Sequence, residues 1–594
     1  MALLLLLQAL AIGAWAQKPQ PARRYWVELR DKTVVSFQPA TYFHPAAQAR
    51  RQRQHLPPFD ATDLPVSAAY LTQVRAHSDT VLLVSRWFNA VACRATPTQL
   101  AELTRLPGVR RVAELPEIAL LPASRPPATP SQIGNDKMAI SAADRQLARQ
   151  QTRTLGAETF RQAGLDGRGL RIAIFDVGFN GADQHPAFRE LFAQQKMVAS
   201  YDFVRHVPDV FHGGTHGLEV LSCLAGRLPD GTLLGMAPAA EYLLARTERM
   251  HREVYAEELD WLAAVEWADR NGADIINSSL GYTTRRYFPE QMNGRTSLVA
   301  RAADLAARKG MLVVNAAGND GDNEDWRTIG TPADADSVLA VGGVNPDTGL
   351  HLDFSAYGPT ADRRLKPNVA AFGTVLAAAP GGYARIDGTS FASPLVAGFA
   401  ACAWQLQRTL PVMALFQQLQ AAASLYPYYD YAHGYGIPQA ETLLRNVRQS
   451  VAPMPARMVD FVLEDSVLAI LIRPEAARPA VVQALPLYVD SVATLDPAAD
   501  APARVAPLGR EETRPTESGS QASGTPAPAV AGRAPLPAAG YLYWHVADAR
   551  GVLRRYEVVE VSQRAILQIP RRTLHPGDVV RVFYQGTTHS YPIR

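Results

Sequence analysis

Cysteine is scarce in this chain of 594 residues, which contains only Cys93, Cys223 and Cys402. Three cysteines cannot build the disulfide framework of a small secreted domain, and none of them is spaced as a CxxC metal or redox motif. Cys223 and Cys402 each lie in an apolar stretch of helical pattern, so we expect free thiols that pack as small hydrophobic side chains. The sequence therefore predicts neither a disulfide framework nor a metal site built on cysteine.

Strong net charge and long hydrophobic runs are also absent. The formal net charge is only +3, which does not provide the basic surface expected of a nucleic-acid-binding protein. No apolar stretch reaches the roughly 20 residues that a membrane-spanning helix needs. We therefore expect no nucleic-acid partner and no membrane span. The chain is nevertheless too long for one hydrophobic core, and its length predicts several domains.

The first residues have the pattern of a secretory signal peptide at 1–16. Residues 3–7 supply a short apolar segment, and Ala14-Trp15-Ala16 is an A-x-A cleavage site before Gln17. This segment contains no lysine or arginine, so its positive charge comes from the amino terminus alone. We expect a secreted protein that is extracellular or associated with the cell surface.

Residues 17–120 predict a small α+β domain. Strands are expected at 25–29, 81–88 and 109–112, with a helix at 98–105 between the last two. The arginine-rich stretch at 50–53 is interpreted as a solvated face. Residues 121–140 are rich in proline and alanine around 120–130, lack periodicity and predict a linker.

Residues 141–450 alternate between apolar runs and helical patterns. Strands are expected at 170–175, 241–245, 274–280, 311–317 and 338–344, and helices at 257–271 and 297–309. This alternation predicts an α/β domain with a mostly parallel sheet that has helices on both faces. Catalytic groups in such a fold belong at the carboxyl ends of the strands.

Beyond residue 450 the alternation of strands and helices stops. Residues 451–496 form a β-rich segment, 497–538 are rich in proline, alanine, serine and glycine and predict a flexible linker, and 539–594 predict an all-β sandwich. A substrate-binding or purely structural role for this C-terminal sandwich remains an alternative to the sorting role considered below.

The most specific stretch is Gly388-Thr389-Ser390-Phe391-Ala392-Ser393-Pro394, which an apolar helical run follows directly. We expect Pro394 in the first turn of that helix, because proline deeper in a helix removes a hydrogen bond and clashes with the preceding turn. Ser390 would then lie at the helix start, where unpaired backbone N–H groups favour a developing oxyanion. The plainer interpretation of this serine is a helix N-cap.

Asp176 and His216 are the candidate partners of Ser390. Asp176 follows a predicted strand and precedes Val177 and Gly178, whereas His216 precedes an apolar helix. His212 is a rival for the histidine position, but it lacks the apolar helix that follows His216. His212, His216 and Glu219 could also be considered as metal ligands, but the two glycines between the histidines argue against one helix face and no further ligand is apparent.

These stretches together resemble the aspartate, histidine and serine motifs of the subtilases, the subtilisin-like serine endopeptidases. The order Asp176, His216, Ser390 is the order of that family. Val177 stands where most members have threonine or serine, and Leu218 replaces the threonine of the histidine motif. The resemblance is greatest to secreted subtilases of Bacteroidota-type bacteria.

The resemblance implies roles for further residues. Asn319, at the end of an Ala-Ala-Gly-Asn phrase, would supply an amide donor to the oxyanion. The walls of the substrate groove would come mainly from the backbone of two segments, Ser279-Leu280-Gly281 and Ala316-Ala317-Gly318, which suits an extended polypeptide bound edgewise.

The family resemblance also assigns the flanking domains. Residues 17–120 resemble an inhibitory propeptide, so the chain's own N-terminal domain would be an intramolecular inhibitor. The C-terminal sandwich resembles the sorting domain of the type IX secretion pathway. Calcium is common in the family, but residues 227–232 show no evident set of oxygen ligands, so we assign no cofactor and no metal.

The sequence therefore predicts a secreted serine endopeptidase that hydrolyses peptide bonds with an Asp-His-Ser triad through an acyl-enzyme intermediate. One alternative is a catalytically inactive subtilase scaffold that acts as a binding or adhesion protein, although every catalytic residue type is present. An esterase is a second alternative, but the chain lacks the G-x-S-x-G motif and its nucleophile comes last.

Overall fold

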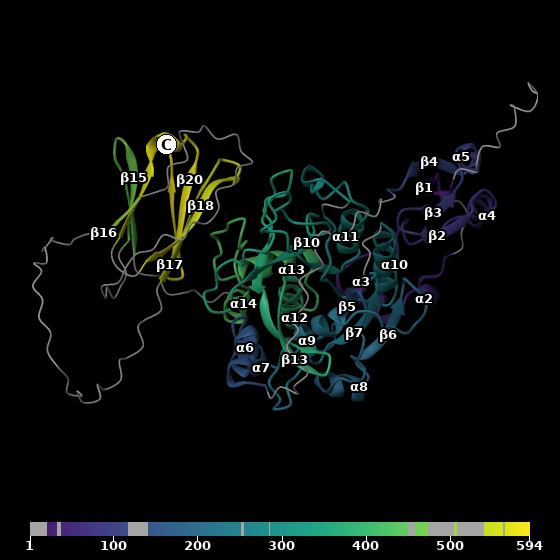
Figure 1. Cartoon of the computed structure of the whole chain (residues 1–594), viewed down its shortest axis with the longest axis horizontal. Helices are drawn as coiled ribbons and strands as arrows, with labels where there is room; N and C mark the ends of the chain where they lie inside the picture. Colours follow the sequence, from purple (N-terminus) through teal and green to yellow (C-terminus); the bar gives the residue numbers. More distant parts are fainter. Residues whose placement is uncertain are drawn as a thin grey trace, which may run out of the picture. The chain divides into compact units, whose positions relative to one another are not determined.

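The computed structural model describes residues 21–32, 37–116, 140–250, 255–283, 286–448, 458–472, 504–507, 540–561 and 565–594. The predicted signal peptide and nearly all of the linker predicted at 121–140 lie outside the described residues. The chain forms two compact units (Figure 1), one of Met1–Ala423 with Tyr431–Asn446, the other of Ser424–Asp430 with Val447–Arg594.

A sheet of seven parallel strands organises the first unit. Its order is β11 (Val369–Phe372), β10 (Val338–Val344), β9 (Leu312–Ala316), β8 (Ile275–Ser278), β5 (Arg171–Asp176), β7 (Glu241–Arg246) and β6 (Met197–Asp202). Every pairing between these strands is parallel. The expected mostly parallel sheet is therefore confirmed, and all of its strands end at the same edge.

Helices cover both faces of this sheet. Along β5, Ile172 and Ile174 pack with α9 (His216–Ala225) and α12 (Thr389–Leu406), whereas Ala173 and Phe175 pack with α10 (Ala256–Arg270) and α11 (Leu298–Arg308). This alternation follows from the two-residue period of a strand. Strands buried on both faces have almost no polar side chains, which is why they appear in the sequence as continuous apolar runs.

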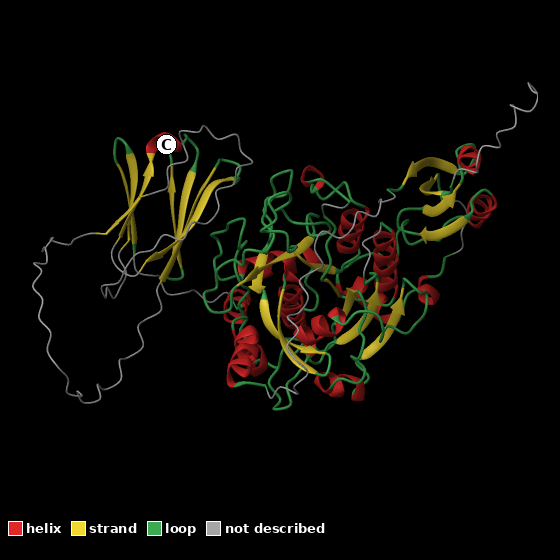
Figure 2. Cartoon of the chain, viewed as in Figure 1, coloured by secondary structure: helices red, strands yellow, loops and turns green. Residues whose placement is uncertain are grey.

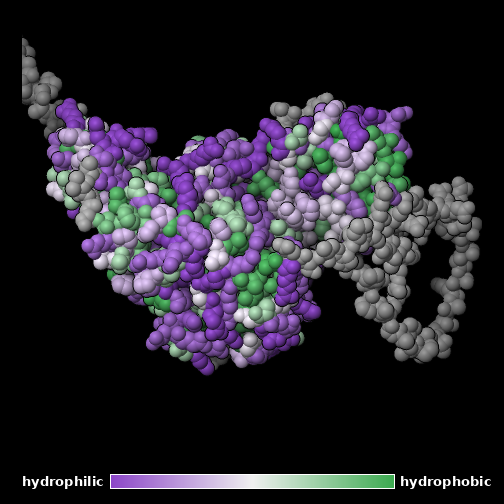
Figure 3. Space-filling model, turned by 180° about the vertical axis from the view of Figure 1, so that it is seen from behind, coloured by the Kyte–Doolittle hydropathy of each residue, from purple (hydrophilic) through white to green (hydrophobic). Residues whose placement is uncertain are grey.

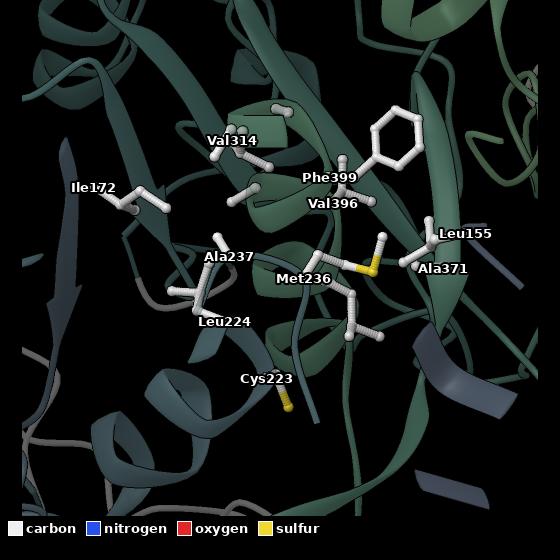
Figure 4. Packing of buried hydrophobic residues seen from close by; sticks show 14 of the residues in the cluster. Leu155, Ile172, Cys223, Leu224, Met236, Ala237, Val314, Ala371, Val396 and Phe399 are labelled. Atoms are coloured by element: carbon white, nitrogen blue, oxygen red, sulfur yellow. The ribbon is translucent and has the colours of Figure 1, made fainter. Parts of the chain in front are cut away.

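Helix α12 is the centre of the larger core. Sixteen of its residues, Thr389 through Trp404, are buried. Figure 4 shows Val396 and Phe399 in one buried cluster with Met236 and with Leu224 of α9. Gly398 lies close to the segment that contains Met236, because a Cβ added at Gly398 would stand 3.0 Å from the Cβ of Met236. The helix is thus held on all sides by other parts of the first unit.

The remaining helices and a β-hairpin of this α/β region surround the core. They are α6 (Ala142–Arg153), α7 (Ala157–Gln162), α8 (Arg189–Ala193), α13 (Val412–Ala421), α14 (Ala440–Val447) and the hairpin of β12 (Thr374–Ala379) with β13 (Gly382–Asp387). Ser141 caps α6 with a reciprocal pair of hydrogen bonds to Asp144, a capping box that fixes where the helix begins.

The N-terminal domain has a four-stranded antiparallel sheet in the order β2 (Thr80–Ser85), β3 (Ala90–Ala95), β1 (Arg23–Leu29) and β4 (Val109–Glu114). Its helices are α2 (Pro39–Tyr42), α3 (Pro45–Arg53), α4 (Ala68–Ala76) and α5 (Pro97–Leu103). The strand predicted to run to residue 88 ends at Ser85, because the chain turns there and Asn89 adopts a φ of 48°. Asparagine tolerates this left-handed conformation better than most residues.

The solvated face predicted for the arginine-rich stretch at 50–53 is wrong for two of its members. Arg50 is 0% exposed and Arg51 is 3% exposed, and both belong to α3. The sequence does not reveal their burial, because Asp269, the carboxylate that both arginines contact, lies more than 200 residues away.

The second unit is built mainly of strands (Figure 2). One sheet has the order β14 (Val459–Leu463), β15 (Val467–Ile472), β19 (Ala565–Pro570), β16 (Arg504–Pro507), and the other β18 (Leu553–Val561), β17 (Gly540–Ala547), β20 (Val579–Tyr584), β21 (Thr587–Pro592). The segment predicted at 451–496 thus contributes β14 and β15 to the sheets that also contain strands after residue 539. Of the predicted linker at 497–538, only 504–507 are described, and they form β16.

A short stretch between α13 and α14 belongs to this second unit. In the segment Ser424–Asp430, Tyr428 is fully buried and its ring stacks on His545 with a centroid separation of 4.8 Å. The Nδ1 of His545 lies 2.7 Å from the carbonyl of Tyr429. Burial lowers the pKa of His545 to about 3, so this imidazole is neutral.

Hydrophilic residues cover most of the molecular face seen in Figure 3, and hydrophobic residues form separate smaller patches on it. Over the described parts of the chain, no helix combines the length and the apolar character that crossing a membrane requires.

The three cysteines generate a first prediction. All three are free and fully buried, and burial raises the pKa of Cys93 to about 11 and that of Cys223 to about 12. Because the thiolate is the reactive form, the native protein should react with Ellman's reagent at least about 100-fold more slowly than the protein unfolded in guanidinium chloride. The unfolded chain should titrate all three thiols, and rapid labelling of any cysteine in the native protein would contradict their burial.

Candidate active site

Asp176 is the last residue of β5, at the carboxyl edge of the parallel sheet. The side chain is 0% exposed. Its Oδ1 accepts a hydrogen bond from the backbone N–H of Val177 at 2.8 Å. The strand therefore fixes both the position and the orientation of this carboxylate.

His216 is the first residue of α9 and lies against Asp176. Its Nδ1 is 2.9 Å from Oδ1 and 3.1 Å from Oδ2 of that aspartate. An ionised carboxylate only accepts hydrogen bonds, so Nδ1 carries the proton and the neutral ring leaves Nε2 as an acceptor. Burial lowers the pKa of His216, but the charge and hydrogen bond of Asp176 outweigh it, and the pKa is raised above the usual 6.5.

Two glycines allow the segments of Asp176 and His216 to approach each other. The N–H of Gly217 donates to the carbonyl of Gly178 at 3.1 Å. A Cβ on Gly217 would lie only 2.4 Å from that carbonyl oxygen. Gly178 has a φ of 134°, and a Cβ there would meet the carbonyl of His212 at 2.3 Å. Side chains at these two positions would separate β5 from α9.

Ser390 is the second residue of α12 and is 8% exposed. Its hydroxyl donates to the carbonyl of Ser279 at 3.2 Å, and the ring of the following Phe391 lies 5.4 Å from the His216 ring, centroid to centroid. The predicted Asp176, His216 and Ser390 thus come from β5, α9 and α12, whose relevant ends meet at one edge of the sheet.

Pro394 does not lie in the first turn, as the sequence suggested, but is the sixth residue of α12. Because proline has no N–H, it leaves the carbonyl of Ser390, four residues earlier, without its helical partner. The hydroxyl of Ser279 donates to this carbonyl at 2.7 Å. Ser390 thus lies at the helix start as expected, but Pro394 falls in the second turn. The hydrogen bond that Pro394 cannot make is replaced by one between α12 and the segment after β8.

Asn319 lies beyond the end of β9 and faces the beginning of α12. Its Oδ1 accepts hydrogen bonds from the backbone N–H and the hydroxyl of Thr389, both at 2.9 Å. With the carbonyl oxygen of the amide occupied in this way, the NH₂ group is the part left to act on another molecule. Thr389 thus orients Asn319. The sequence analysis did not assign this role to Thr389, although its position directly before Ser390 in the serine motif could have indicated it.

The two segments predicted to line a substrate groove differ in their backbone bonding. The N–H of Ala317 donates to Val341 at 2.9 Å and its carbonyl accepts from Gly330 at 3.1 Å, so the backbone of Ala317 is fully engaged. Gly281, in contrast, is exposed, and a Cβ there would meet no atom within 4 Å. The remaining residues of the two segments are Ser279, Leu280, Ala316 and Gly318, of which Ser279 and Ala316 are buried.

His212 does not contact Asp176. Its Nε2 lies 2.9 Å from Asp202, and Arg246 also donates to this carboxylate at 2.8 Å. The Nε of Arg246 donates to the carbonyl of Val177 at 2.9 Å. Arg246 and Asp202, which the sequence analysis missed, therefore brace the loop that follows Asp176.

Glu219 is a second carboxyl group close to the Asp176–His216 pair that the sequence analysis did not assign. It is 7% exposed and accepts a hydrogen bond from the hydroxyl of Thr215 at 3.3 Å. Burial raises its pKa, and Asp176 raises it further, although His216 opposes this shift. Within the ranges that the structure describes, no group of three histidine, cysteine, aspartate or glutamate side chains is placed to hold a metal ion.

A recess of about 810 Å³ opens near the start of α9. Its lining residues include Asn180, Thr215, Leu218 and, at the turn of the β12–β13 hairpin, residues 381–383. Asp176, His216 and Ser390 are not among its lining residues, although Thr215 and Leu218 flank His216 in the sequence.

An Asp–His pair and a helix-borne serine at the carboxyl edge of a parallel sheet are typical of subtilisin-like serine peptidases. Comparison with known proteins agrees: the model described as "Subtilase family" matches residues 167–436, and that described as "Peptidase S8 propeptide domain, Bacteroidota" matches residues 24–128. The chain belongs to the subtilase family and is a serine endopeptidase with a propeptide domain.

Individual relatives cover the same region. Subtilisin DY of Bacillus licheniformis is 30% identical over 269 residues, which are 45% of this chain and 88% of that one. Subtilisin E of Bacillus subtilis (strain 168) is 30% identical over 248 residues, 41% of this chain and 58% of that one. The solved structure of the prenylagaramide maturation protease PagA matches with a TM-score of 0.40 and 26% identity, over 50% of this chain and 99% of that one.

The close contact between Gly217 and the carbonyl of Gly178 generates a second prediction. Gly217→Ala should push the start of α9 away from Gly178 and displace His216 from Asp176, lowering kcat/KM about 100-fold. Gly382→Ala is the matched control, because a Cβ there meets no atom within 4 Å. Activity on a peptide substrate would be measured for both variants. An unchanged kcat/KM in Gly217→Ala would show that a side chain at position 217 does not displace His216 from Asp176.

Proposed function

We propose that Asp176, His216 and Ser390 form the catalytic triad of a secreted serine endopeptidase that cleaves polypeptides through an acyl-enzyme intermediate. The observation that carries this proposal is the hydrogen-bonded pair of a fully buried aspartate and a partly exposed histidine beside the serine-bearing end of α12. The side chain of Asp176 is 0% exposed and that of His216 is 31% exposed. A buried base-orienting carboxylate with an accessible imidazole is what nucleophilic catalysis by serine requires.

Each group then has a defined role in the reaction. Ser390 attacks the carbonyl carbon of the peptide while Nε2 of His216 takes its proton and later gives it to the leaving amine. Asp176 holds the imidazole in the tautomer protonated at Nδ1 and stabilises the imidazolium that forms. Water then attacks the acyl-enzyme ester, again with His216 as the base, and releases the carboxylic acid product together with free Ser390.

The developing oxyanion would be stabilised by two kinds of donor. The amide NH₂ of Asn319 is left available because its oxygen is bound by Thr389. The backbone N–H of Ser390 lies in the first turn of α12, where N–H groups have no partner within the helix. Both donors are positioned before the reaction, which is what makes such stabilisation effective.

An extended polypeptide is the substrate that we infer. It would bind edgewise between Ser279-Leu280-Gly281 and Ala316-Ala317-Gly318. The exposed Gly281 offers open space on one side, whereas the backbone of Ala317 is already bonded, so its side would contribute contact surface rather than hydrogen bonds.

We further infer that the N-terminal domain inhibits the peptidase until the chain is cut between the two, and that the signal peptide pattern at 1–16 directs secretion. The C-terminal sandwich is assigned to sorting or binding, and the similarity of its turns at Asp548–Gly551 and Pro576–Asp578 to type IX sorting domains favours sorting.

The decisive experiment is fluorophosphonate labelling of the purified protein, with the modified peptide and the new N terminus identified by mass spectrometry. We expect label on Ser390 in protein that has lost its N-terminal domain. Ser390→Ala should abolish labelling and self-cleavage, whereas Ser393→Ala, three residues later in the same helix, should still be labelled. Processed protein that takes no label would instead be a binding scaffold without catalysis.

The raised pKa of His216 predicts the acidic limit of activity. Because the base must be neutral, kcat/KM should fall as the pH decreases through a pKa above 6.5. Asp176→Asn removes the charge that raises this pKa, so the half-maximal point should move to lower pH, and kcat should drop by about 10⁴.

Asp183→Asn is the control for this measurement, since Asp183 is an exposed carboxylate a few residues after Asp176. Its pH profile of kcat/KM on a peptide substrate should match that of the unaltered protein. A profile of the Asp176→Asn variant with the same acidic midpoint would contradict the pairing of this aspartate with the catalytic base.

A further inference from the structure

The groove segment Ser279-Leu280-Gly281 is held by buried residues at both of its ends, whereas Gly281 itself is exposed. At one end, Ser279 is buried and its hydroxyl donates to the carbonyl of Ser390 at 2.7 Å. At the other end, Tyr282 follows directly and is only 2% exposed. The position of Gly281 therefore depends on how firmly Tyr282 is held.

Tyr282 is fixed through its backbone and through its side chain. Its N–H donates to the carbonyl of Thr331 at 2.9 Å. Its hydroxyl donates to Oε1 of Glu248 at 2.6 Å, and the guanidinium carbon of Arg286 lies 4.1 Å from the centre of its ring. Glu248 comes two residues after the end of β7. The hydroxyl of Tyr282 thus ties the groove segment to the carboxyl edge of the sheet.

Glu248, Glu257, Tyr282 and Arg286 form a buried polar network, which we call the Glu248 network. Glu257, in the first turn of α10, binds Arg286, and their side chains are 0% and 1% exposed. Glu257 also accepts a hydrogen bond from the N–H of Arg249 at 3.0 Å. Glu248 is hydrogen-bonded to Glu257. Because an ionised carboxylate only accepts hydrogen bonds, these two carboxyl groups share one proton.

The surroundings of the Glu248 network contain further ionisable groups. Glu258 of α10 lies 3.6 Å from Arg286 and accepts a hydrogen bond from the hydroxyl of Tyr287 at 2.7 Å. Arg249 brings a second guanidinium, but this group pairs with Asp260 at 2.9 Å. On the side of α11, Tyr255 interacts with Glu258 and Arg301 interacts with Tyr255. Three buried glutamates therefore share the guanidinium of Arg286.

This imbalance of charge keeps a proton on the network. A buried carboxylate without a matching cation is costly, so such a group holds its proton instead. Burial raises the pKa of Glu248 well above its usual range, and the neighbouring Glu257 raises it further. Arg286 and the hydroxyl of Tyr282 oppose this shift without reversing it. Glu248 is therefore protonated at neutral pH.

We propose that Glu248 is a positioning residue for substrate binding, which in its protonated form holds Tyr282 and thereby the groove segment. When hydroxide removes the shared proton at alkaline pH, two carboxylates repel each other, their hydrogen bond is lost and Tyr282 is loosened. A polypeptide then binds more weakly, while the reaction at Ser390 is unaffected. This inference rests on the proposed function, because that function assigns the groove segment to substrate binding.

The Glu248 network belongs to the peptidase domain alone. Glu248 follows β7, Glu257 lies on α10, and Tyr282 and Arg286 follow β8. All four fall within residues 167–436, the range that matches the subtilase family. The network therefore remains when the N-terminal domain has been removed, and the processed enzyme is the protein to test.

The test is the pH dependence of KM and kcat on a peptide substrate, over the range in which the protein stays folded. In unaltered protein, KM should rise about tenfold toward alkaline pH while kcat keeps its plateau. Glu248→Gln should keep the neutral KM and lose the alkaline rise, because its amide donates to Glu257 and accepts from Tyr282 as the protonated carboxyl does. Glu248→Ala lacks both bonds, so its KM should be raised about tenfold at every pH.

Matched controls separate positioning from loss of stability. Tyr282→Phe removes only the hydroxyl and should raise KM about tenfold with little change in kcat. Tyr242→Phe is its control, because Tyr242 is also buried and its hydroxyl donates to the carbonyl of Ala237 at 2.7 Å, but it lies near the amino end of β7. This variant should lose similar stability and keep its KM. Glu290→Gln, at an exposed glutamate, should keep the alkaline rise in KM.

Fluorophosphonate labelling distinguishes this inference from the proposed function. If the unaltered processed protein takes no label on Ser390, the proposed function fails. If it is labelled but its KM does not change with pH, or if Glu248→Gln shows the same alkaline rise as Glu290→Gln, the positioning role is overturned. Reduced labelling of Tyr282→Phe, or a KM no higher than that of Tyr242→Phe, would also overturn it. If Glu248→Ala does not fold, Glu248→Gln and Tyr282→Phe decide.

Discussion

Burial of α12 is the constraint on which the peptidase domain depends. The helix packs against the sheet through β8, β9 and β10 and against α9, and each fully buried leucine, valine or phenylalanine contributes about 1.5–3 kcal/mol. A helix enclosed in this way cannot shift along its axis without disrupting the whole core. Ser390 is held in place because it belongs to the first turn of this helix. The hydroxyl of Ser279 also binds the Ser390 carbonyl, which Pro394 leaves without a partner in the helix.

The other groups at the carboxyl edge are also fixed in place by contacts within the protein. Asp176 ends a fully buried strand, Thr389 turns the amide of Asn319, and Arg246 holds the carbonyl of Val177. None of these groups depends on a flexible side chain reaching across solvent. The site is therefore preorganised by main-chain contacts and buried polar side chains, with the glycines at 178 and 217 allowing the segments to meet.

Local pattern accounts for what could be predicted from the sequence. Five of the seven strands of the central sheet (β5, β7, β8, β9 and β10), the helices α10 and α11 and the proximity of Asp176 to His216 follow from apolar runs and short motifs. The edge strands β6 and β11 were not predicted, because most side chains of β6 are only partly buried and β11 has only four residues. The place of Pro394 in α12 was misjudged, because the Ser279 hydroxyl that compensates for its missing N–H lies more than 100 residues away. The buried Arg50 and Arg51 were missed for the same reason, since Asp269 is remote in the sequence and a run of arginines alone indicates exposure.

The two edges of the parallel sheet carry different groups. Asp176 ends β5 at the carboxyl edge, whereas Arg53 pairs with Asp274 directly before β8, at the amino edge. Gln54 likewise donates to the carbonyl of Gly310, shortly before β9. The N-terminal domain is therefore held in part by contacts at the amino edge that leave the candidate catalytic groups untouched, so a substitution in one set need not disturb the other.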